Sequence, residues 1–233
     1  MIFVKSEDLK YGMRLAKPIY NKTGVLLYER NTRLTLQGIE SVKNFGLLGL
    51  YILEPAEPVP PMSEEDLDFE RFQTMAVFSI REELDNIIAG REPVNLKRLA
   101  NAIITNYGRL DHKITFTQNL RSTTDYVYKH VINTAILCAL ISAQVYYTPT
   151  EQEELVLAAL LHDIGKLLLP NKVREKYDDY DTNDLIIVKK IQNDGLGLLR
   201  PEIGIDSGVR RIVAQIHRME YGNSNLEQGK ILK

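Results

Sequence analysis

The chain has little cysteine, almost no net charge and no long uninterrupted apolar run. Its single cysteine among 233 residues, Cys138, cannot form an internal disulfide, so the sequence fits a reducing compartment. Because Cys138 lies in the apolar stretch NTAILCALISA, we interpret it as a small buried hydrophobe and not as a nucleophile. The formal net charge of −2 provides no basic field, which argues against a nucleic-acid polymer or an anionic membrane as a partner.

The chain also lacks a recognisable targeting segment. The N-terminal stretch MIFVKSEDLKYG does not contain the long apolar core of a signal peptide. The most apolar stretches, 131–144 and 155–169, are too short or too interrupted to span a bilayer. We therefore expect a cytoplasmic protein that does not contact a membrane.

A proline-rich stretch separates two regions of different pattern. Residues 1–54 predict a small β-rich module, with a hairpin turn at Asn21–Gly24, a helix in LTLQGIESVKNFG and a strand in LGLYILE. The prolines of EPAEPVPPMSEED predict a stiff linker at 55–63. Residues 64–233 have helical spacing, so we expect a mainly α fold: a helical domain preceded by a small α+β, β-rich module.

Apolar spacing predicts the individual helices of the second region. They are expected at 64–89, 95–108, 125–145, 183–193 and 207–219. Ser63 and Asp66 are typical of an N-cap pair, and Thr150 with Glu153 predicts a capping box for a further helix containing ELVLAALLHDIGKLLLP. The acidic stretch YDDYDTND, 177–184, is interpreted as a solvated loop.

Three ionisable residues interrupt the apolar stretch ELVLAALLHDIGKLLLP. His162 and Asp163 offer an imidazole and a carboxylate at adjacent positions, and both groups are good ligands for Zn, Fe or Mn. Burial of an unpaired carboxylate costs several kcal/mol, so a positive group should lie near Asp163. Lys166 follows on the same helical side and can supply that charge.

The remaining histidines are few. Among the four in the chain, His130 and His217 lie on two other predicted helices, whereas His112 in GRLDHKIT is interpreted as a surface residue. Helical bundles build metal sites from side chains on facing helices, which favours a site that combines His130, His162, Asp163 and His217. A single histidine on an apolar helix is more often packed and hydrogen-bonded, so spacing alone leaves both readings open.

The motif HDIGK, preceded by a helix with DYVYKHVINTA, resembles the HD superfamily of metal-dependent phosphohydrolases. The nearer resemblance is to the HD-GYP branch, which hydrolyses the bacterial messenger cyclic di-GMP, and it extends across 120–222. Residues 7–52 are also similar to a short module often found ahead of HD-GYP domains.

The resemblance implies roles for individual residues. His130, His162, Asp163 and His217 would bind one or two divalent transition-metal ions, Fe, Mn or Zn. Asp163 and Lys166 would be catalytic, with Lys166 contacting the scissile phosphate. The implied activity is hydrolysis of a cyclic dinucleotide or another phosphodiester by a metal-activated water.

The sequence departs from the family pattern at several positions. Ile191 and Ile216 stand where histidine ligands are expected, and Tyr126 stands where some members carry a glutamate. Ser224-Asn225-Leu226 replaces Gly-Tyr-Pro, and a further aspartate ligand would belong to a helix beyond Lys233. Because isoleucine has no lone pair to donate, the second metal position would keep only Asp163 and His217 among the implied ligands.

These departures leave a second function open. The alternative to an enzyme is a catalytically degenerate HD module that acts as a signalling, nucleotide-binding or protein-docking domain. Such a module would work through a homodimer or a signalling partner.

Overall fold

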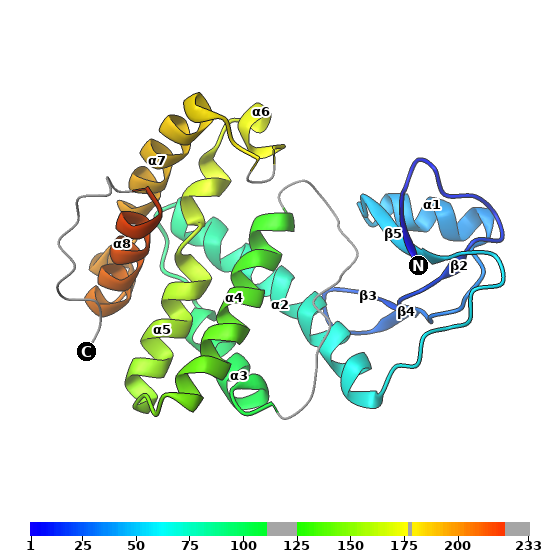
Figure 1. The fold of residues 1–233 in the computed structure, drawn as a ribbon, viewed down its shortest axis with the longest axis horizontal. Helices are drawn as coiled ribbons and strands as arrows, with labels where there is room; N and C mark the ends of the chain where they lie inside the picture. Colours follow the sequence, from blue (N-terminus) through cyan, green and yellow to red (C-terminus); the bar gives the residue numbers. More distant parts are fainter. Residues whose placement is uncertain (111–124, 177–178, 222–233) are drawn as a thin grey trace. The chain divides into compact units, whose positions relative to one another are not determined.

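The computed structural model describes residues 1–110, 125–176 and 179–221 (Figure 1). The chain divides into two compact units, 1–82 with 109–133 and 83–108 with 134–233. The division falls within two continuous helices, α2 (Glu64–Ile88) and α4 (Asp125–Gln144). The domain boundary predicted at 55–63 therefore does not coincide with this division and stays a prediction.

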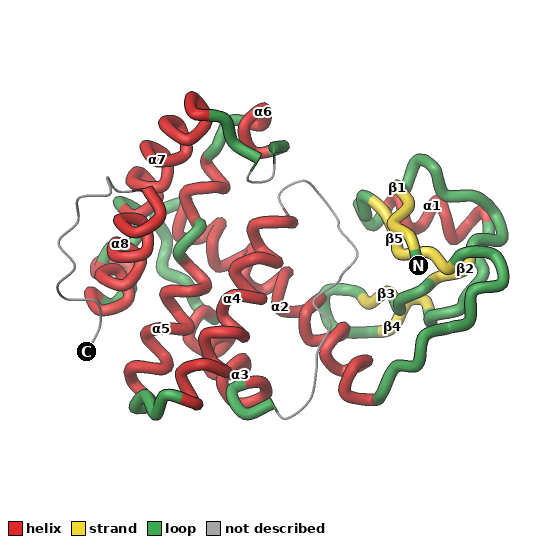
Figure 2. The backbone as a smooth tube through the Cα atoms, viewed as in Figure 1, coloured by secondary structure: helices red, strands yellow, loops and turns green. Residues whose placement is uncertain are grey.

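The first unit contains the strands of the described chain (Figure 2). A three-stranded antiparallel sheet has the order β1-β5-β2, formed by β1 (Ile2–Lys5), β5 (Gly49–Leu53) and β2 (Arg14–Leu15). The strand in LGLYILE is thus confirmed, whereas β1 was not predicted. No hairpin turn follows Ile2–Lys5 in the sequence. The strand pairs with a segment more than forty residues away, so the local sequence does not identify its partner.

A hairpin forms the second sheet. Strand β3 (Ile19–Tyr20) pairs antiparallel with β4 (Leu26–Tyr28), which confirms the turn predicted at Asn21–Gly24. The side-chain Oδ1 of Asn21 accepts backbone N–H bonds from Thr23 and Val25 at 2.9 Å each. Gly24 has a φ of +78°, a conformation that favours glycine.

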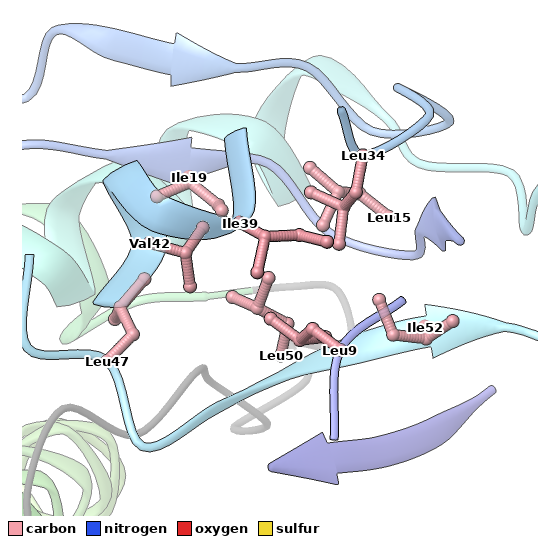
Figure 3. Close-up of a cluster of buried hydrophobic side chains, with 9 residues drawn as sticks. All are labelled: Leu9, Leu15, Ile19, Leu34, Ile39, Val42, Leu47, Leu50 and Ile52. Atoms are coloured by element: carbon pink, nitrogen blue, oxygen red, sulfur yellow. The ribbon is translucent and has the colours of Figure 1, made fainter. Parts of the chain in front are cut away.

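Helix α1 (Leu36–Asn44) closes the core of the β-rich module, as predicted. Its N-cap is Thr35, whose hydroxyl accepts a hydrogen bond from the backbone N–H of Gly38. Ile39 and Val42 are buried, while Leu36 in the first turn is exposed. Figure 3 shows the buried cluster, which consists of Leu9, Leu15, Ile19, Leu34, Ile39, Val42, Leu47, Leu50 and Ile52.

The proline-rich segment is tied to the β-rich module by polar contacts. Arg14 donates to the carbonyl oxygens of Glu54 and Glu57, and the N-terminal ammonium forms an ion pair with Glu57 at 2.6 Å. The side chain of Arg30 donates to the carbonyl oxygen of Pro60. The segment 55–63 therefore lies against the module along much of its length.

Helix α2 follows the segment, and its predicted N-cap pair is confirmed. The backbone N–H of Asp66 donates to Ser63 Oγ at 3.1 Å, and Ser63 N–H donates to Asp66 Oδ2 at 2.9 Å. Its buried apolar side chains recur at helical spacing: Phe69, Ala76, Val77, Ile80, Leu84 and Ile87. The same helix buries Glu70 in an ion pair with Lys17.

The second unit is helical, and the mainly α fold is confirmed. It contains α3 (Leu96–Tyr107), α5 (Pro149–Leu161), α6 (Asn171–Arg174), α7 (Thr182–Leu196), α8 (Ser207–Tyr221) and the 3-10 helices η1 (Ile164–Leu168) and η2 (Pro201–Ile203). Helix α5 is central, because it contacts α3 and α8, while α7 contacts η1 and α8.

Two helix starts differ from the predictions. The capping box of α5 is Thr148 with Glu151, not Thr150 with Glu153, because Pro149 is accommodated at the first helical position. A second capping box, Asp181 with Asp184, begins α7. The loop predicted for 177–184 is therefore wrong from residue 182 onward, and residues 177–178 lie outside the described residues.

Helix α4 is longer than the apolar stretch 131–144 considered from the sequence. Its 20 residues are long and apolar enough to cross a membrane by length and composition alone, and 44% of its apolar window is buried inside the structure. Core helices of soluble proteins have the same properties, so this finding is weak evidence for a membrane span.

Candidate metal centre

The His162–Asp163 pair lies at a turn between two helices. Helix α5 ends at Leu161, His162 is its C-cap, and Asp163 immediately precedes η1. Every residue from Val156 to Leu161 is buried, so α5 is a core helix and its C-terminal end lies inside the unit. His162 is 5% exposed and Asp163 is 1% exposed.

The imidazole of His162 is held in a fixed orientation. Its Nδ1 lies 2.8 Å from the carbonyl oxygen of Ala159. Because a carbonyl oxygen can only accept, Nδ1 carries the proton and donates it. The lone pair is then on Nε2, which lies 3.6 Å from Asp163 Oδ2. A histidine whose other nitrogen is fixed in this way is a typical metal ligand.

The two carboxylate oxygens of Asp163 have different neighbours. Oδ1 accepts a hydrogen bond of 2.7 Å from Gln192 Nε2. Oδ2 forms an ion pair with Lys166 Nζ at 3.0 Å. The lysine supplies the positive charge that the sequence predicts beside a buried carboxylate, and Lys166 is itself only 8% exposed.

Gln192 was not predicted as part of the site. The family pattern points to Ile191, but Ile191 packs against the apolar cluster of Leu169, Val173 and Val188. The sequence does contain a signal for Gln192, because the buried residues of α7 are Asp184, Val188, Gln192 and Gly195 at helical spacing. An amide rather than an imidazole is therefore the α7 group at Asp163.

Two glycines allow α7 to approach the turn so closely. A Cβ at Gly165 would lie 2.3 Å from Gln192 Oε1 and 2.8 Å from the carbonyl oxygen of Ile191. A Cβ at Gly195 would lie 2.6 Å from the Cα of Gly165. The glycine of HDIGK is thus required for backbone contact between η1 and α7.

His130 is a third ligand expected from the sequence, and its role as a ligand stays a prediction. His130 lies on α4, and its ring stacks on that of Tyr126 with centroids 6.0 Å apart. Two imidazoles and a carboxylate fit Zn, Fe or Mn.

The ring of His217 contacts the backbone of His162. Its Nε2 lies 2.7 Å from the carbonyl oxygen of His162, so Nε2 donates to that oxygen. The ring is 5% exposed and lies on α8. The contact braces the turn, and the role of His217 as a metal ligand stays a prediction.

Several other positions considered from the sequence have no described contact with the His162–Asp163 pair or lie beyond the described chain. Ile216 on α8 is partly buried. His112, Ser224, Asn225, Leu226 and Lys233 lie outside the described residues.

Comparison with known proteins gives one family. The family model of the HD domain matches residues 127–231. No curated protein and no solved structure matches the chain. The match includes the His162–Asp163 pair, Lys166 and the helices that carry them, so this part of the chain is similar to HD domains.

Proposed function

We propose that this chain is a metal-dependent phosphohydrolase that hydrolyses a phosphodiester at the His162–Asp163 pair. The observation that carries the proposal is the buried His162–Asp163 pair, in which Asp163 Oδ2 lies 3.6 Å from His162 Nε2 and 3.0 Å from Lys166 Nζ. The HD-domain match at residues 127–231 supports the same chemistry, because HDIGK resembles the HD superfamily of metal-dependent phosphohydrolases.

The residues present fit a divalent ion. The Ala159 carbonyl oxygen fixes the proton of His162 on Nδ1, which leaves Nε2 to bind a cation. Asp163 presents Oδ2 on the same side, 3.6 Å from that nitrogen. When bound, a divalent ion polarises a phosphoryl oxygen and lowers the pKa of a water molecule.

Lys166 is the residue that would bind the substrate. Its ammonium lies 3.0 Å from Asp163 Oδ2, and a cation bound by Asp163 would compete for that oxygen. Lys166 could then pair with a phosphate oxygen and stabilise the charge that develops on it. Burial strengthens this interaction, because few water molecules screen it.

Cyclic di-GMP is the substrate that we propose within this class. The support is sequence resemblance: HDIGK, the preceding Tyr-x-x-x-His of Tyr126 to His130, and the β-rich module resemble HD-GYP proteins. The protein would act in the cytoplasm of a bacterium as part of cyclic dinucleotide signalling.

One observation favours a second candidate, a non-catalytic HD module that regulates through binding. The α7 residue at Asp163 is Gln192, whose neutral amide is a poor substitute for an imidazole ligand. Such a module would keep the fold and the buried polar network without turnover, and it would act through a homodimer or a signalling partner.

Hydrolysis assays separate the two candidates. The full chain, freed of metal and reloaded with Mn²⁺ or Zn²⁺, is incubated with cyclic di-GMP and with bis(p-nitrophenyl) phosphate. We expect turnover that requires metal and falls by at least about a hundredfold in His162→Ala and Asp163→Asn.

Asp194→Asn is the matched control, because Asp194 is an exposed carboxylate on α7. It should keep wild-type turnover. Metal binding without turnover of either substrate would favour the regulatory module, and turnover that survives Asp163→Asn would place the chemistry elsewhere.

A further inference from the structure

We infer that Gln192 limits the metal centre to one ion by occupying one oxygen of Asp163. The inference rests on the proposed function, because it concerns the metal that the His162–Asp163 pair would hold. It adds a positioning residue that the family pattern does not provide, and it fixes the number of ions.

The hydrogen bond from Gln192 is short and shielded from water. The donor atom Nε2 lies 2.7 Å from Asp163 Oδ1, and Gln192 and Asp163 are each 1% exposed. A hydrogen bond to a buried carboxylate is stronger than one between neutral groups at the surface. Breaking it would leave a buried donor without an acceptor, which is costly.

The amide cannot simply turn aside. Its Oε1 lies where a side chain on Gly165 would begin, 2.3 Å from the position of an added Cβ. Gly165 and Gly195 lie against each other, so η1 and α7 pack backbone to backbone beside the amide. Within the described residues Oε1 is buried and has no hydrogen-bond partner, so its position follows from packing and from the bond made by Nε2.

The hydrogen bond from Gln192 gives the two oxygens of the Asp163 carboxylate different roles. Oδ2 is the oxygen near His162 Nε2 and Lys166 Nζ, at 3.6 Å and 3.0 Å, so a cation binds there. A carboxylate can bridge two ions by binding one ion with each of its oxygens. A second ion at Oδ1 would have to displace the Gln192 N–H, whose positive end repels a cation.

Metal titration of the full chain tests the inference directly. Metal-free protein is titrated with Mn²⁺, and free Mn²⁺ is followed by electron paramagnetic resonance, with metal content checked after desalting. We expect one Mn²⁺ per chain. Gln192→Leu removes the donor and should weaken Mn²⁺ binding by about 10- to 100-fold, as with other residues that orient metal ligands.

Two further variants complete the experiment. Asn193→Leu is the matched control, because Asn193 is the exposed neighbour on α7 and its loss should leave Mn²⁺ affinity unchanged. Gln192→Glu replaces the donor with an oxygen at nearly constant shape, and we expect it to bind a second Mn²⁺ between the two carboxylates. Circular dichroism checks that each variant is folded, and the wild-type stoichiometry needs no variant.

The possible outcomes separate failure of the inference about Gln192 from failure of the proposed function. Two Mn²⁺ per wild-type chain would overturn the inference and leave the proposed function intact. Wild-type affinity in folded Gln192→Leu, or a single Mn²⁺ in Gln192→Glu, would also overturn it. Absence of bound Mn²⁺, Zn²⁺ and Fe²⁺ would overturn the proposed function, and the inference with it.

Discussion

Asp163 is the residue on which the proposed chemistry depends, and each of its two carboxylate oxygens has a polar neighbour in the structure. Lys166 neutralises its charge at one oxygen, and Gln192 satisfies the other. Both oxygens of this buried carboxylate therefore have a polar partner in the structure. The same arrangement makes the lysine a competitor of the metal.

Replacement of Lys166 should therefore separate metal binding from turnover. Lys166→Met removes the cation that lies 3.0 Å from Asp163 Oδ2, so Mn²⁺ affinity should rise. Turnover should fall by about 10²- to 10³-fold, the usual loss when one charge-stabilising donor is removed. Calorimetry and hydrolysis rates measure the two effects, and exposed Lys172 on α6 supplies the control Lys172→Met. Weaker Mn²⁺ binding in Lys166→Met would contradict this competition.

At the residue scale, the sequence predicts the candidate metal ligands better than it predicts the residues that hydrogen-bond to them. A histidine and an aspartate in an apolar stretch stand out by cost of burial alone, and Lys166 follows from charge balance. Gln192 does not stand out, because a neutral amide gives no charge signal and the family pattern draws attention to Ile191. Its identification needs the rotation of α7, which tertiary packing sets.

At the scale of elements, the turn after α5 works because η1 and α7 touch backbone to backbone. Gly165 and Gly195 remove the side chains that would separate them. The packing brings Gln192 to Asp163, while Ile191 joins the apolar cluster beside it. The glycine of HDIGK thus serves the site through packing and not through chemistry.

Gly165→Ala should therefore damage both stability and the site. The added Cβ would lie 2.3 Å from Gln192 Oε1 and 2.7 Å from Gln192 Cα, distances that force the helices apart. We expect a loss of about 1–3 kcal/mol in unfolding free energy by urea titration, together with weaker metal binding. Leu168→Ala, at an exposed position of η1, is the control and should change stability by about 0.5 kcal/mol or less. Equal stability of the two variants would argue against the close packing.

The N-cap of α7 makes a prediction about pH. Hydrogen bonds from the backbone of Asp184 and from the side chain of Lys176 lower the pKa of Asp181 from 3.8 to about 2. A lowered carboxyl pKa stabilises the fold above the unfolded-state pKa, and this contribution is lost as pH falls from about 4 to about 2.

Asp181→Ala should remove that part of the pH dependence. Between pH 4 and pH 2, the unfolding free energy of the wild type should fall more steeply than that of the variant, as measured by urea titration at each pH. The exposed Asp194 of the same helix gives the control Asp194→Ala, which should keep the wild-type slope. Parallel curves for the wild type and Asp181→Ala would contradict the capping role.

The sequence predicts which segments are helices and where most of them lie. It predicts the first residues of helices and the pairing partners of strands less well. The spacing of apolar residues locates α2, α3, α4 and α8, since their faces repeat over three or more turns. The start of α5 was placed two residues late, because Thr148 and Thr150 both have an acidic residue three positions on. The pairing of β1 was missed, because its partner β5 is distant in sequence.

At the scale of the whole molecule, the first unit joins the β-rich module to helix α2 through a buried ion pair. Lys17 and Glu70 each retain 7% side-chain exposure. Burial raises the pKa of Glu70, and the attraction of Lys17 offsets this rise only in part. The pair therefore costs desolvation energy while it fixes the contact between the module and α2.

Replacing only one member of the ion pair should lower the unfolding free energy more than replacing both. Glu70→Gln leaves a buried ammonium without its counter-charge and should cost about 3–5 kcal/mol of unfolding free energy. The double variant Lys17→Met/Glu70→Leu should recover most of that loss. Glu7→Gln is the control, because Glu7 pairs with Lys5 at 3.9 Å in an exposed position and contributes little. Equal destabilisation by the single and double variants would show that the two residues do not act as a pair.

Anomalous scattering can locate a divalent ion bound by the His162–Asp163 pair. Crystals of the full chain soaked in Zn²⁺ are measured on both sides of the zinc absorption edge. We expect one peak, about 2.0–2.2 Å from His162 Nε2 and from Asp163 Oδ2. A zinc peak at other residues only, with none at this pair, would contradict this expectation.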